Sequence, residues 1–394
     1  MSTVRAQAVT GASAARARAA AARFDRLGDI ARRMEIVHAA AACLGPGLKE
    51  RFATLAMVTA GYRACRDAAG RYALHAEPCV VCTVTHKWQE AAPGQAPPGE
   101  PLPTRLLIRC AGRGRAQDYA VPVDVQSLQW FAGIGAQGSN GILVADPHGL
   151  SHGAITCAIR VQAAHGGQWY AMSALHVLTP MPPLDGLPAP GQGFAPIGQP
   201  AGVGTSTAYS GMLRQGGISF DAQLAHIDSA WFNAAFSGGA LGPCPPLRSR
   251  AELDQLAHQS RFIVLAPGNA AAHALAPRAP ILAQFSLYAD GNFPILYNVS
   301  RNGMSFAAEI YHAELIVLAA GLDQAVSEPG DSGSPVIALS NGSAVFVGML
   351  IAGPAPGSGA DRMVVLPAWQ LLDPDNWSTL PAGTQALAAA FFIQ

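Results

Sequence analysis

The sequence predicts a mainly β protein that begins with a helical region. From about Asp146 onward, short apolar segments rich in Val, Ile and Leu alternate with Gly- and Pro-containing stretches, as in proteins built of many short strands. Before about Arg66, apolar residues instead recur at helical spacing. A chain of 394 residues with 50% hydrophobic content can bury one large core or two ordinary ones, so a main domain and an accessory region both fit.

The first part of the chain, residues 1–70, is predicted to be helical. The segments 24–44 and 48–65 each carry apolar residues at helical spacing, and "GPG" at 45–47 separates them. We therefore expect an antiparallel helical hairpin. It is either a surface for self-association or partner docking, or a cap with no function of its own.

A strand-rich accessory segment is predicted over residues 71–145. Its strand-like stretches are "EPCVVCTVTHKW" (77–88), "TRLLIRCA" (104–111) and "DYAVPVDV" (118–125), and the Pro- and Gly-rich residues 90–103 interrupt them. We expect this segment to belong to the accessory region rather than to the main domain.

Residues 146–394 are predicted to form the main domain, with roughly eight to ten short strands in a β-sandwich or a pair of barrels. Clear examples are "GAITCAIRVQA" (153–163), "FPILYNVS" (293–300) and "AVFVGMLIAG" (344–353). The Gly- and Pro-rich stretch from Pro180 to about Gly217 is expected to be a long loop, either an active-site lid or a disordered insert.

Charge and hydropathy exclude several classes of partner. Lys and Arg number 25 and Asp and Glu number 25, so at zero net charge no long-range field favours nucleic acid or an anionic membrane. No run of about 18 apolar residues is present, so no membrane-spanning helix is expected. Arginines interrupt the Ala-rich N-terminus, which resembles a transit peptide or a frayed helix and not a secretory signal. These features predict a cytoplasmic protein.

The cysteines favour a reducing compartment and no metal. Seven cysteines, an odd number scattered over the chain, do not form a disulfide framework. Cys79 and Cys82 form a C-x-x-C motif, but it lies in a strand-like run, where residues three apart point to opposite faces. No second pair has the spacing of a zinc site, so we expect neither a metal nor a cofactor.

The stretch "EPGDSGSP" at residues 328–335 presents a candidate nucleophile, Ser332, between glycines that favour a tight turn. In such a turn the backbone amides of Gly330 and Ser332 can converge as an oxyanion hole. A serine hydroxyl becomes a good nucleophile only beside a base that takes its proton, and that base needs a carboxylate to orient it.

Candidates for the base and the carboxylate lie at strand ends. Among eleven histidines, His176 follows the apolar stretch "QWYAMSAL", where strand gives way to loop, and is either the base or a buried structural histidine. Asp221 and Asp228 flank an alternating apolar strand. We favour Asp221 because it begins this strand and so lies at its mouth.

Taken together, these contexts resemble the trypsin-like (chymotrypsin-fold) serine peptidases. The residues that carry the resemblance are "SALHV" at 173–177, "DAQLA" at 221–225, "GDSGSPV" at 330–336 and "GMLIAG" at 348–353, in the chain order His, Asp, Ser. The resemblance covers roughly residues 146 to 375. It implies two six-stranded β-barrels with the site in the cleft between them.

By this resemblance each matching residue has a role. His176 is expected to act as general base and then acid, with Asp221 orienting it, while Ser332 attacks the substrate and the amides of Gly330 and Ser332 form the oxyanion hole. The resemblance also assigns Ile351, Ala352 and Gly353 to the strand along which the substrate backbone adds as an extra strand.

Two departures from the family concern cysteine. Val177 stands where secreted members have a cysteine after the histidine, and Glu328 stands where they have one before the serine turn. The absence of these disulfides points to an intracellular, bacterial-type branch that is also found in plants. Ser334 replaces the second glycine of the usual serine motif.

The resemblance places Val326 at the base of the specificity pocket, with Ser327 beside it and Gly353 on the facing wall. Such a pocket offers no countercharge to Arg or Lys, and burying an unpaired cation costs several kcal/mol. We expect cleavage after small or medium apolar residues.

The sequence therefore predicts a serine endopeptidase that cleaves protein or peptide substrates through an acyl-enzyme. Two alternatives remain: a catalytically idle binding module on the same fold, and a serine esterase.

Overall fold

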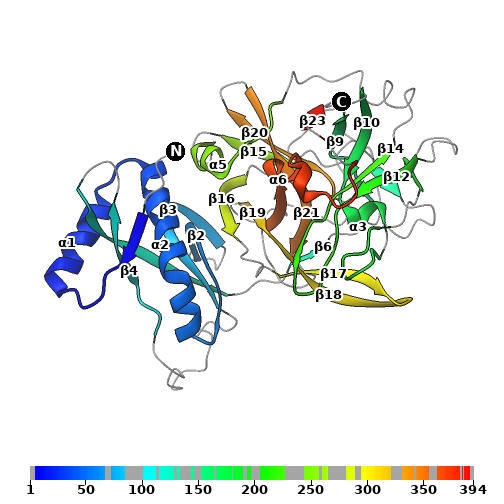
Figure 1. Cartoon of the computed structure of the whole chain (residues 1–394). Helices are drawn as coiled ribbons and strands as arrows, with labels where there is room; N and C mark the ends of the chain where they lie inside the picture. The colour runs from blue at the N-terminus through cyan, green and yellow to red at the C-terminus, as the bar shows by residue number, and fades with distance from the viewer. Residues whose placement is uncertain are drawn as a thin grey trace. The chain divides into compact units, whose positions relative to one another are not determined.

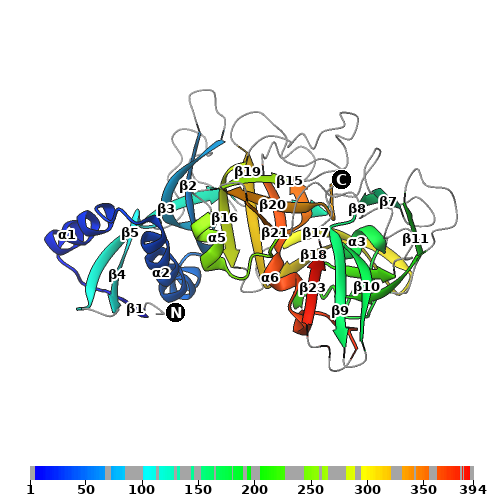
Figure 2. The same cartoon turned by 90° about the horizontal axis from the view of Figure 1, so that it is seen from above.

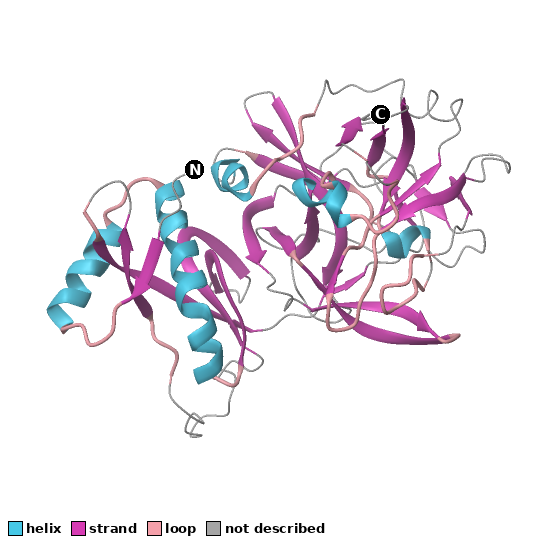
Figure 3. Cartoon of the chain, in the orientation of Figure 1, coloured by secondary structure: helices cyan, strands magenta, loops and turns pink. Residues whose placement is uncertain are grey.

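A computed structural model of the chain describes residues 5–66, 72–84, 101–111, 115–127, 131–133, 143–145, 152–163, 166–179, 181–189, 193–196, 205–226, 244–256, 260–264, 281–288, 294–320, 331–340, 343–354, 362–381, 384 and 386–390. The protein is mainly β, as the sequence predicts, and helices are few (Figure 3). It divides into two compact units: Met1–Gln129 with Ala283–Tyr288, and Trp130–Leu282 with Ala289–Gln394.

The first unit is a five-stranded sheet with two helices. In sheet order its strands are β1 (Arg5–Ala8), β4 (Arg105–Ala111), β5 (Gln117–Ser127), β3 (Tyr72–Val84) and β2 (Leu55–Arg66). The pair β3 and β5 is parallel, and the other neighbours are antiparallel. The helices α1 (Ala14–Asp25) and α2 (Ile30–Arg51) contact these strands, α1 mainly on β5 and α2 mainly on β2 (Figure 1).

Local sequence explains where these helices begin. Ser13 caps α1 by accepting a hydrogen bond from the Arg16 backbone N–H, and Asp29 caps α2 by accepting one from Ala31. Each helix buries an apolar stripe, which includes Ala20, Phe24, Met34, Ile36, Val37 and Ala40.

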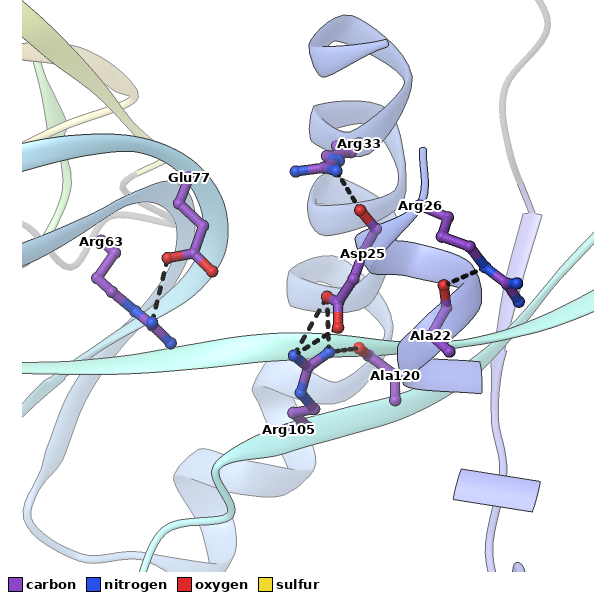
Figure 4. A network of polar contacts seen from close by, with 8 residues as sticks. All are labelled: Ala22, Asp25, Arg26, Arg33, Arg63, Glu77, Arg105 and Ala120. Carbon is purple, nitrogen blue, oxygen red and sulfur yellow. Dashed lines mark hydrogen bonds and ion pairs between the residues drawn. The ribbon is translucent and has the colours of Figure 1, made fainter. Parts of the chain in front are cut away.

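Polar contacts tie the end of α1 to β4 and β5 (Figure 4). The Arg105 guanidinium donates to the Asp25 carboxylate at 3.0 Å and to the backbone oxygen of Ala120 at 2.9 Å. A separate ion pair joins Arg63 of β2 to Glu77 of β3 at 3.1 Å. Because these groups are largely exposed, apolar burial rather than charge pairing holds the helices in place. Self-association through the helices stays a prediction.

The predicted helical hairpin is wrong. Its second half is not a helix, because residues 55–66 form β2, which pairs with β3 over its whole length. The "GPG" break is also absent, since α2 runs through Pro46 to Arg51. Val58, Thr59 and Tyr62 favour a strand, and pairing with β3 outweighs the helical spacing. The region predicted to be helical and the strand-rich segment both contribute strands to this one sheet. The predicted boundaries at 70 and 145 stay a prediction.

Both cysteines of the C-x-x-C motif are fully buried in β3. Burial raises the pKa of Cys79 well above its ordinary value and that of Cys82 to about 12. Such thiols are protonated and unreactive at neutral pH. Six of the seven cysteines are free thiols in the described part of the chain.

The second unit contains an eight-stranded sheet. In sheet order its strands are β23 (Ala386–Ala390), β9 (Cys157–Ala163), β10 (Gly166–Ser173), β14 (Gln223–His226), β12 (Thr205–Ser210), β11 (Gly193–Pro196), β7 (Leu143–Ala145) and β8 (His152–Ala154). The one-turn helix α3 (Leu175–Leu178) lies against β7 and β8 (Figure 2).

The remaining strands form a ten-stranded sheet. In sheet order they are β13 (Ile218–Ser219), β18 (Met304–His312), β17 (Pro294–Arg301), β6 (Phe131–Gly133), β21 (Ser343–Pro354), β20 (Pro335–Ser340), β15 (Arg261–Val264), β16 (Ile281–Tyr288), β19 (Glu314–Ala320) and β22 (Arg362–Pro367). β21 pairs with β20, β22 and β6, so the sheet folds back on itself there. Short helices complete the unit: α5 (Arg250–Leu256), α6 (Ala368–Leu371) and a 3₁₀ turn (Pro374–Asn376).

The core of the second unit is apolar. Its largest fully buried side chains include Ile159, Met172, Leu175, Leu178, Leu213, Phe262 and Phe346. Among the described strands no pairing joins β23 to β8, so the eight-stranded sheet is open and the predicted pair of six-stranded barrels stays a prediction.

The predicted long loop from Pro180 to Gly217 is wrong in part. Two of its segments, Gly193–Pro196 and Thr205–Ser210, are the strands β11 and β12, which pair with each other and with β7 and β14. Their Gly and Pro content gives no strand pattern in the sequence. Strands this short form only where neighbouring strands supply hydrogen bonds. No helix in the described residues is both long enough and apolar enough to cross a bilayer.

Candidate active site

The sheet register brings His176 and Asp221 together. β10 and β14 are antiparallel, with Ser173 opposite Gln223, so the end of one strand lies beside the start of the other. The chain leaves β10 through Ala174 into the helix α3, which carries His176. Asp221 lies two residues before β14. The predicted placement of both residues at strand ends agrees with this geometry.

Ser332 lies in a tight turn just before β20. The Ser334 backbone N–H donates to the Asp331 oxygen at 2.9 Å, and that of Gly333 donates to the Leu350 oxygen of β21 at 2.8 Å. Gly333 has a φ of +87°, a conformation that glycine adopts without strain. An added Cβ there would lie 2.1 Å from the backbone oxygen of Ala154, so only glycine fits.

The serine turn is also held by β8 and the residues that follow it. The Ala154 backbone N–H donates to the Ser332 oxygen at 2.8 Å. The Thr156 hydroxyl donates to the Gly333 oxygen at 2.6 Å. Strands from both large sheets therefore fix the position of Ser332.

The three side chains form one hydrogen-bonded line. His176 Nδ1 lies 2.8 Å from Asp221 Oδ2, and His176 Nε2 lies 2.9 Å from Ser332 Oγ. The His176 backbone N–H also donates to Asp221 Oδ1, at 3.2 Å. Ser332 and Asp221 are fully buried and His176 is 9% exposed. Of the two predicted carboxylates, Asp228 lies outside the described residues.

Proton counting defines the tautomer of His176. An ionised carboxylate only accepts hydrogen bonds, so Nδ1 carries the proton that points to Asp221, and Nε2 is left as an acceptor facing the serine hydroxyl. The same hydroxyl lies 3.3 Å from the backbone oxygen of Ile351, which is a longer contact. This arrangement is what a serine needs to pass its proton to a base.

Sequence reasoning missed two residues of this site, Tyr297 and His312. The Tyr297 hydroxyl donates to Asp221 Oδ2 at 2.9 Å and lies 3.2 Å from His312 Nε2. Tyr297 lies on β17 and His312 on β18, and both are buried. The only signal was a tyrosine within an apolar strand, and a tyrosine there is more often a core residue.

Burial and charge shift the pKa values of this cluster. Burial alone would raise the pKa of Asp221, but the neighbouring His176 and the hydrogen bonds from His176 and Tyr297 lower it overall. Burial and the Asp221 charge raise the pKa of Tyr297 well above its ordinary value. Burial lowers the pKa of His312 to about 4, which outweighs the attraction of Asp221. At neutral pH, Asp221 is therefore charged while Tyr297 and His312 are neutral.

The predicted oxyanion-hole and substrate-binding residues are described in part. Ile351, Ala352 and Gly353 lie on β21, next to the serine turn, and all three are buried. Gly330, Val326 and Ser327 lie outside the described residues. In the part of the chain that the structure describes, no group of three or more His, Cys, Asp or Glu side chains could hold a metal ion.

Comparisons with known proteins add little. No family model matches the chain, and no curated protein matches it. Among solved structures, an inactive mutant of a chimeric murine norovirus NS6 protease aligns with 53% of this chain and 91% of its own, at 13% identity and a TM-score of 0.24. A likeness at this TM-score does not establish a shared fold, so the resemblance to trypsin-like peptidases stays a prediction.

Proposed function

We propose that this chain is a serine endopeptidase in which Ser332 attacks the peptide carbonyl, His176 transfers the proton and Asp221 orients His176. One observation supports it above all others: the contacts of 2.8 and 2.9 Å that join Asp221, His176 and Ser332 in one line. The ionised Asp221 also stabilises the imidazolium that forms when His176 takes the serine proton.

The proposed reaction needs no group besides the chain, a peptide and water. Ser332 Oγ bonds to the carbonyl carbon while its proton moves to His176 Nε2. The oxyanion then collapses as the amine leaves with that proton, and an ester on Ser332 remains. Water, deprotonated by His176, hydrolyses the ester. The backbone amides of Gly330 and Ser332 are the proposed donors to the oxyanion. A pocket formed by Val326, Ser327 and Gly353 would favour small or medium apolar residues before the cleaved bond.

Labelling with a fluorophosphonate tests the proposal. We expect the purified protein to gain one phosphonyl adduct, seen by intact mass, and Ser332→Ala and His176→Ala to gain none. Thr156→Val, which keeps the triad but removes a hydrogen bond to the serine turn, should label more slowly. A Ser332→Ala protein that still unfolds in one cooperative thermal transition shows that the loss of labelling is chemical and not a loss of structure.

Two results would contradict the proposal. An adduct that persists in Ser332→Ala places the nucleophile elsewhere. If the folded wild-type protein gains no adduct, and its Ala132→Pro variant gains none either, the chain is a binding module rather than a peptidase. Turnover of casein compared with that of p-nitrophenyl esters distinguishes a peptidase from an esterase.

A further inference from the structure

The edge of β21 beside Ser332 is already occupied by the chain itself. β6 pairs with it in antiparallel register: Gly133 lies opposite Ala352, Ala132 opposite Gly353 and Phe131 opposite Pro354. β6 is not a free edge either, because its other side pairs in parallel with β17, where Phe131 lies opposite Ile295 and Ala132 opposite Leu296. The segment therefore lies between β21 and β17 as a central strand (Figure 1).

This edge of β21 leads to the serine. Ile351 precedes Ala352 on β21, and its backbone oxygen lies 3.3 Å from Ser332 Oγ. A peptide that reaches Ser332 with its backbone paired to β21 must therefore use the edge beside Ala352 and Gly353. Adding a strand to a sheet edge is a common way for proteins to bind extended peptides.

The direction of β6 is that of a substrate. Because the pairing is antiparallel, the chain runs from Phe131 to Gly133 while its partners run from Pro354 back to Ala352, toward Ile351. The C-terminal end of β6 thus points to the serine. In a peptide substrate, the residues on the amino side of the cleaved bond approach the nucleophile in this direction.

Burial agrees with an occupied site. Ser332, Ile351 and Ala352 are all 0% exposed, although an enzyme that acts on other proteins must expose its nucleophile. In the structure as it stands, an external peptide cannot pair with Ala352 and Gly353 unless β6 first leaves.

We propose that β6 is the first substrate of the chain's own serine, and that cleavage of a bond just after Gly133 separates residues 1–133, which include Met1–Gln129 of the first unit, from the rest of the sequence. This inference rests on the proposed function. Ser332 Oγ would bond to the carbonyl carbon of that peptide bond and become acylated, while the C–N bond breaks and the new amino terminus leaves with the proton carried by His176. Water then releases the new carboxyl terminus and regenerates the serine. The net change is one peptide bond and one water converted to a carboxylate and an ammonium group.

Incubation of the purified full-length protein tests this. We expect wild type to convert with time into two fragments whose new ends lie within the few residues that follow Gly133, as read by intact mass and terminal sequencing. Ser332→Ala should remain one chain of 40.7 kDa. Because the reacting parts belong to one molecule, the fraction cleaved per hour should not change on tenfold dilution. A rate that falls about tenfold with the dilution is cleavage between molecules and overturns the proposal.

Ala132→Pro is the variant that separates this inference from the proposed function. β6 has a strand on each side, so the N–H of Ala132 faces a partner whichever way it points, and proline removes that bond and does not fit a central strand. We expect self-cleavage to slow by about tenfold or more, because β6 no longer holds the peptide bond next to Ser332. Fluorophosphonate labelling of Ser332 should be kept or increased.

Each other outcome is decisive. A chain that labels at Ser332 but stays whole is a peptidase that does not cut itself, which overturns the inference and leaves the function standing. The same holds if only Ala132→Pro labels and wild type neither labels nor cleaves, since β6 is then a block and not a substrate. If neither protein labels or cleaves while both are folded, the proposed function itself fails.

Discussion

Asp221 gathers three hydrogen-bond donors although it is fully buried. His176 supplies its ring Nδ1–H and its backbone N–H, and Tyr297 supplies its hydroxyl. A buried carboxylate is stable only when such donors replace its lost water. The Tyr297 hydroxyl thus holds the orientation of Asp221, and through it the ring of His176, without reaching Ser332 itself.

Removing the Tyr297 hydroxyl should impair both stability and reaction. Tyr297→Phe keeps the ring but leaves Asp221 with one donor fewer and His312 without its acceptor. Hydrogen bonds to charged groups contribute about 1.5–3 kcal/mol, so we expect a loss of about 2 kcal/mol in the free energy of unfolding, measured by urea denaturation in the Ser332→Ala background. With Ser332 intact, fluorophosphonate labelling should slow by about tenfold.

Tyr311→Phe is the matched control for Tyr297→Phe. It removes a hydroxyl from the neighbouring strand, where the hydroxyl of Tyr311 contacts the exposed Glu309 at 3.0 Å. This variant should label at the wild-type rate and unfold at the wild-type midpoint. Equal behaviour of the two variants would contradict the role assigned to Tyr297.

His312 is neutral, and its contact with Tyr297 shows which ring nitrogen donates a hydrogen bond. Tyr297 has one hydrogen and gives it to Asp221, so at their 3.2 Å contact His312 Nε2 must be the donor. A hydrogen bond between the His312 ring and the backbone of Ser219 favours the protonated ring, but burial outweighs it. A second proton on this ring would place a positive charge in the buried cluster, which explains why burial lowers the pKa of His312 to about 4.

The lowered pKa of His312 predicts a loss of stability in mild acid. As the pH falls below about 6.5, the unfolded chain takes up a proton at this histidine and the folded protein does so only near pH 4. The stabilisation is fully present above pH 6.5 and is lost toward pH 4, by roughly 3 kcal/mol. His312→Gln, which keeps a donor to Tyr297 but does not titrate, should lose about that much less over the same range. Urea denaturation at pH 4 to 7 in the Ser332→Ala background measures this, and parallel curves for the two proteins would refute it.

At the scale of elements, the sequence predicts strands well where their own residue types favour a strand. The triad contexts could be located because each lies where a strand with apolar residues, such as β10 or β20, meets small residues or glycine. Those signals are local. The spacing of His176, Asp221 and Ser332 needed no knowledge of which strands pair.

Elements that depend on distant partners could not be predicted. β2 carries helical spacing but becomes a strand because β3 pairs along it, and β11 and β12 exist through hydrogen bonds to each other and to β7 and β14. α2 continues through Pro46, and the helix as a whole packs on β2 and β3. These are cases in which tertiary pairing outweighs local preference.

β6 and Tyr297 were hidden for the same reason. Three residues, Phe131 to Gly133, carry no periodicity, and only the pairing with β21 and β17 gives them a role. Tyr297 follows an ordinary strand pattern, and only the packing of β17 brings its hydroxyl to Asp221. Both become visible when non-local pairing is known. The residues that surround the candidate triad are thus less local in the sequence than the triad itself.

Over the whole molecule, the zero net charge is the sum of two parts of opposite charge. Residues 1–133 contain 17 Lys and Arg against 10 Asp and Glu, whereas residues 134–394 contain 8 against 15. The net charges are therefore +7 and −7, although the chain as a whole carries none. The total hides this division: residues 134–308 are neutral, with seven Arg against seven Asp and Glu, and the negative charge lies in residues 309–394.

Cleavage after Gly133 should therefore yield fragments of opposite charge. In urea at pH 7, where the chains are unfolded and held by no contacts, we expect the N-terminal fragment to bind a cation exchanger and the C-terminal fragment an anion exchanger. Uncleaved Ser332→Ala, with zero net charge, should elute early from both. The charges separate the fragments but do not locate the cut, because residues 134–308 contain seven Arg and seven Asp and Glu. New ends outside the few residues that follow Gly133, read by terminal sequencing of the separated fragments, would show that β6 does not present the bond to Ser332.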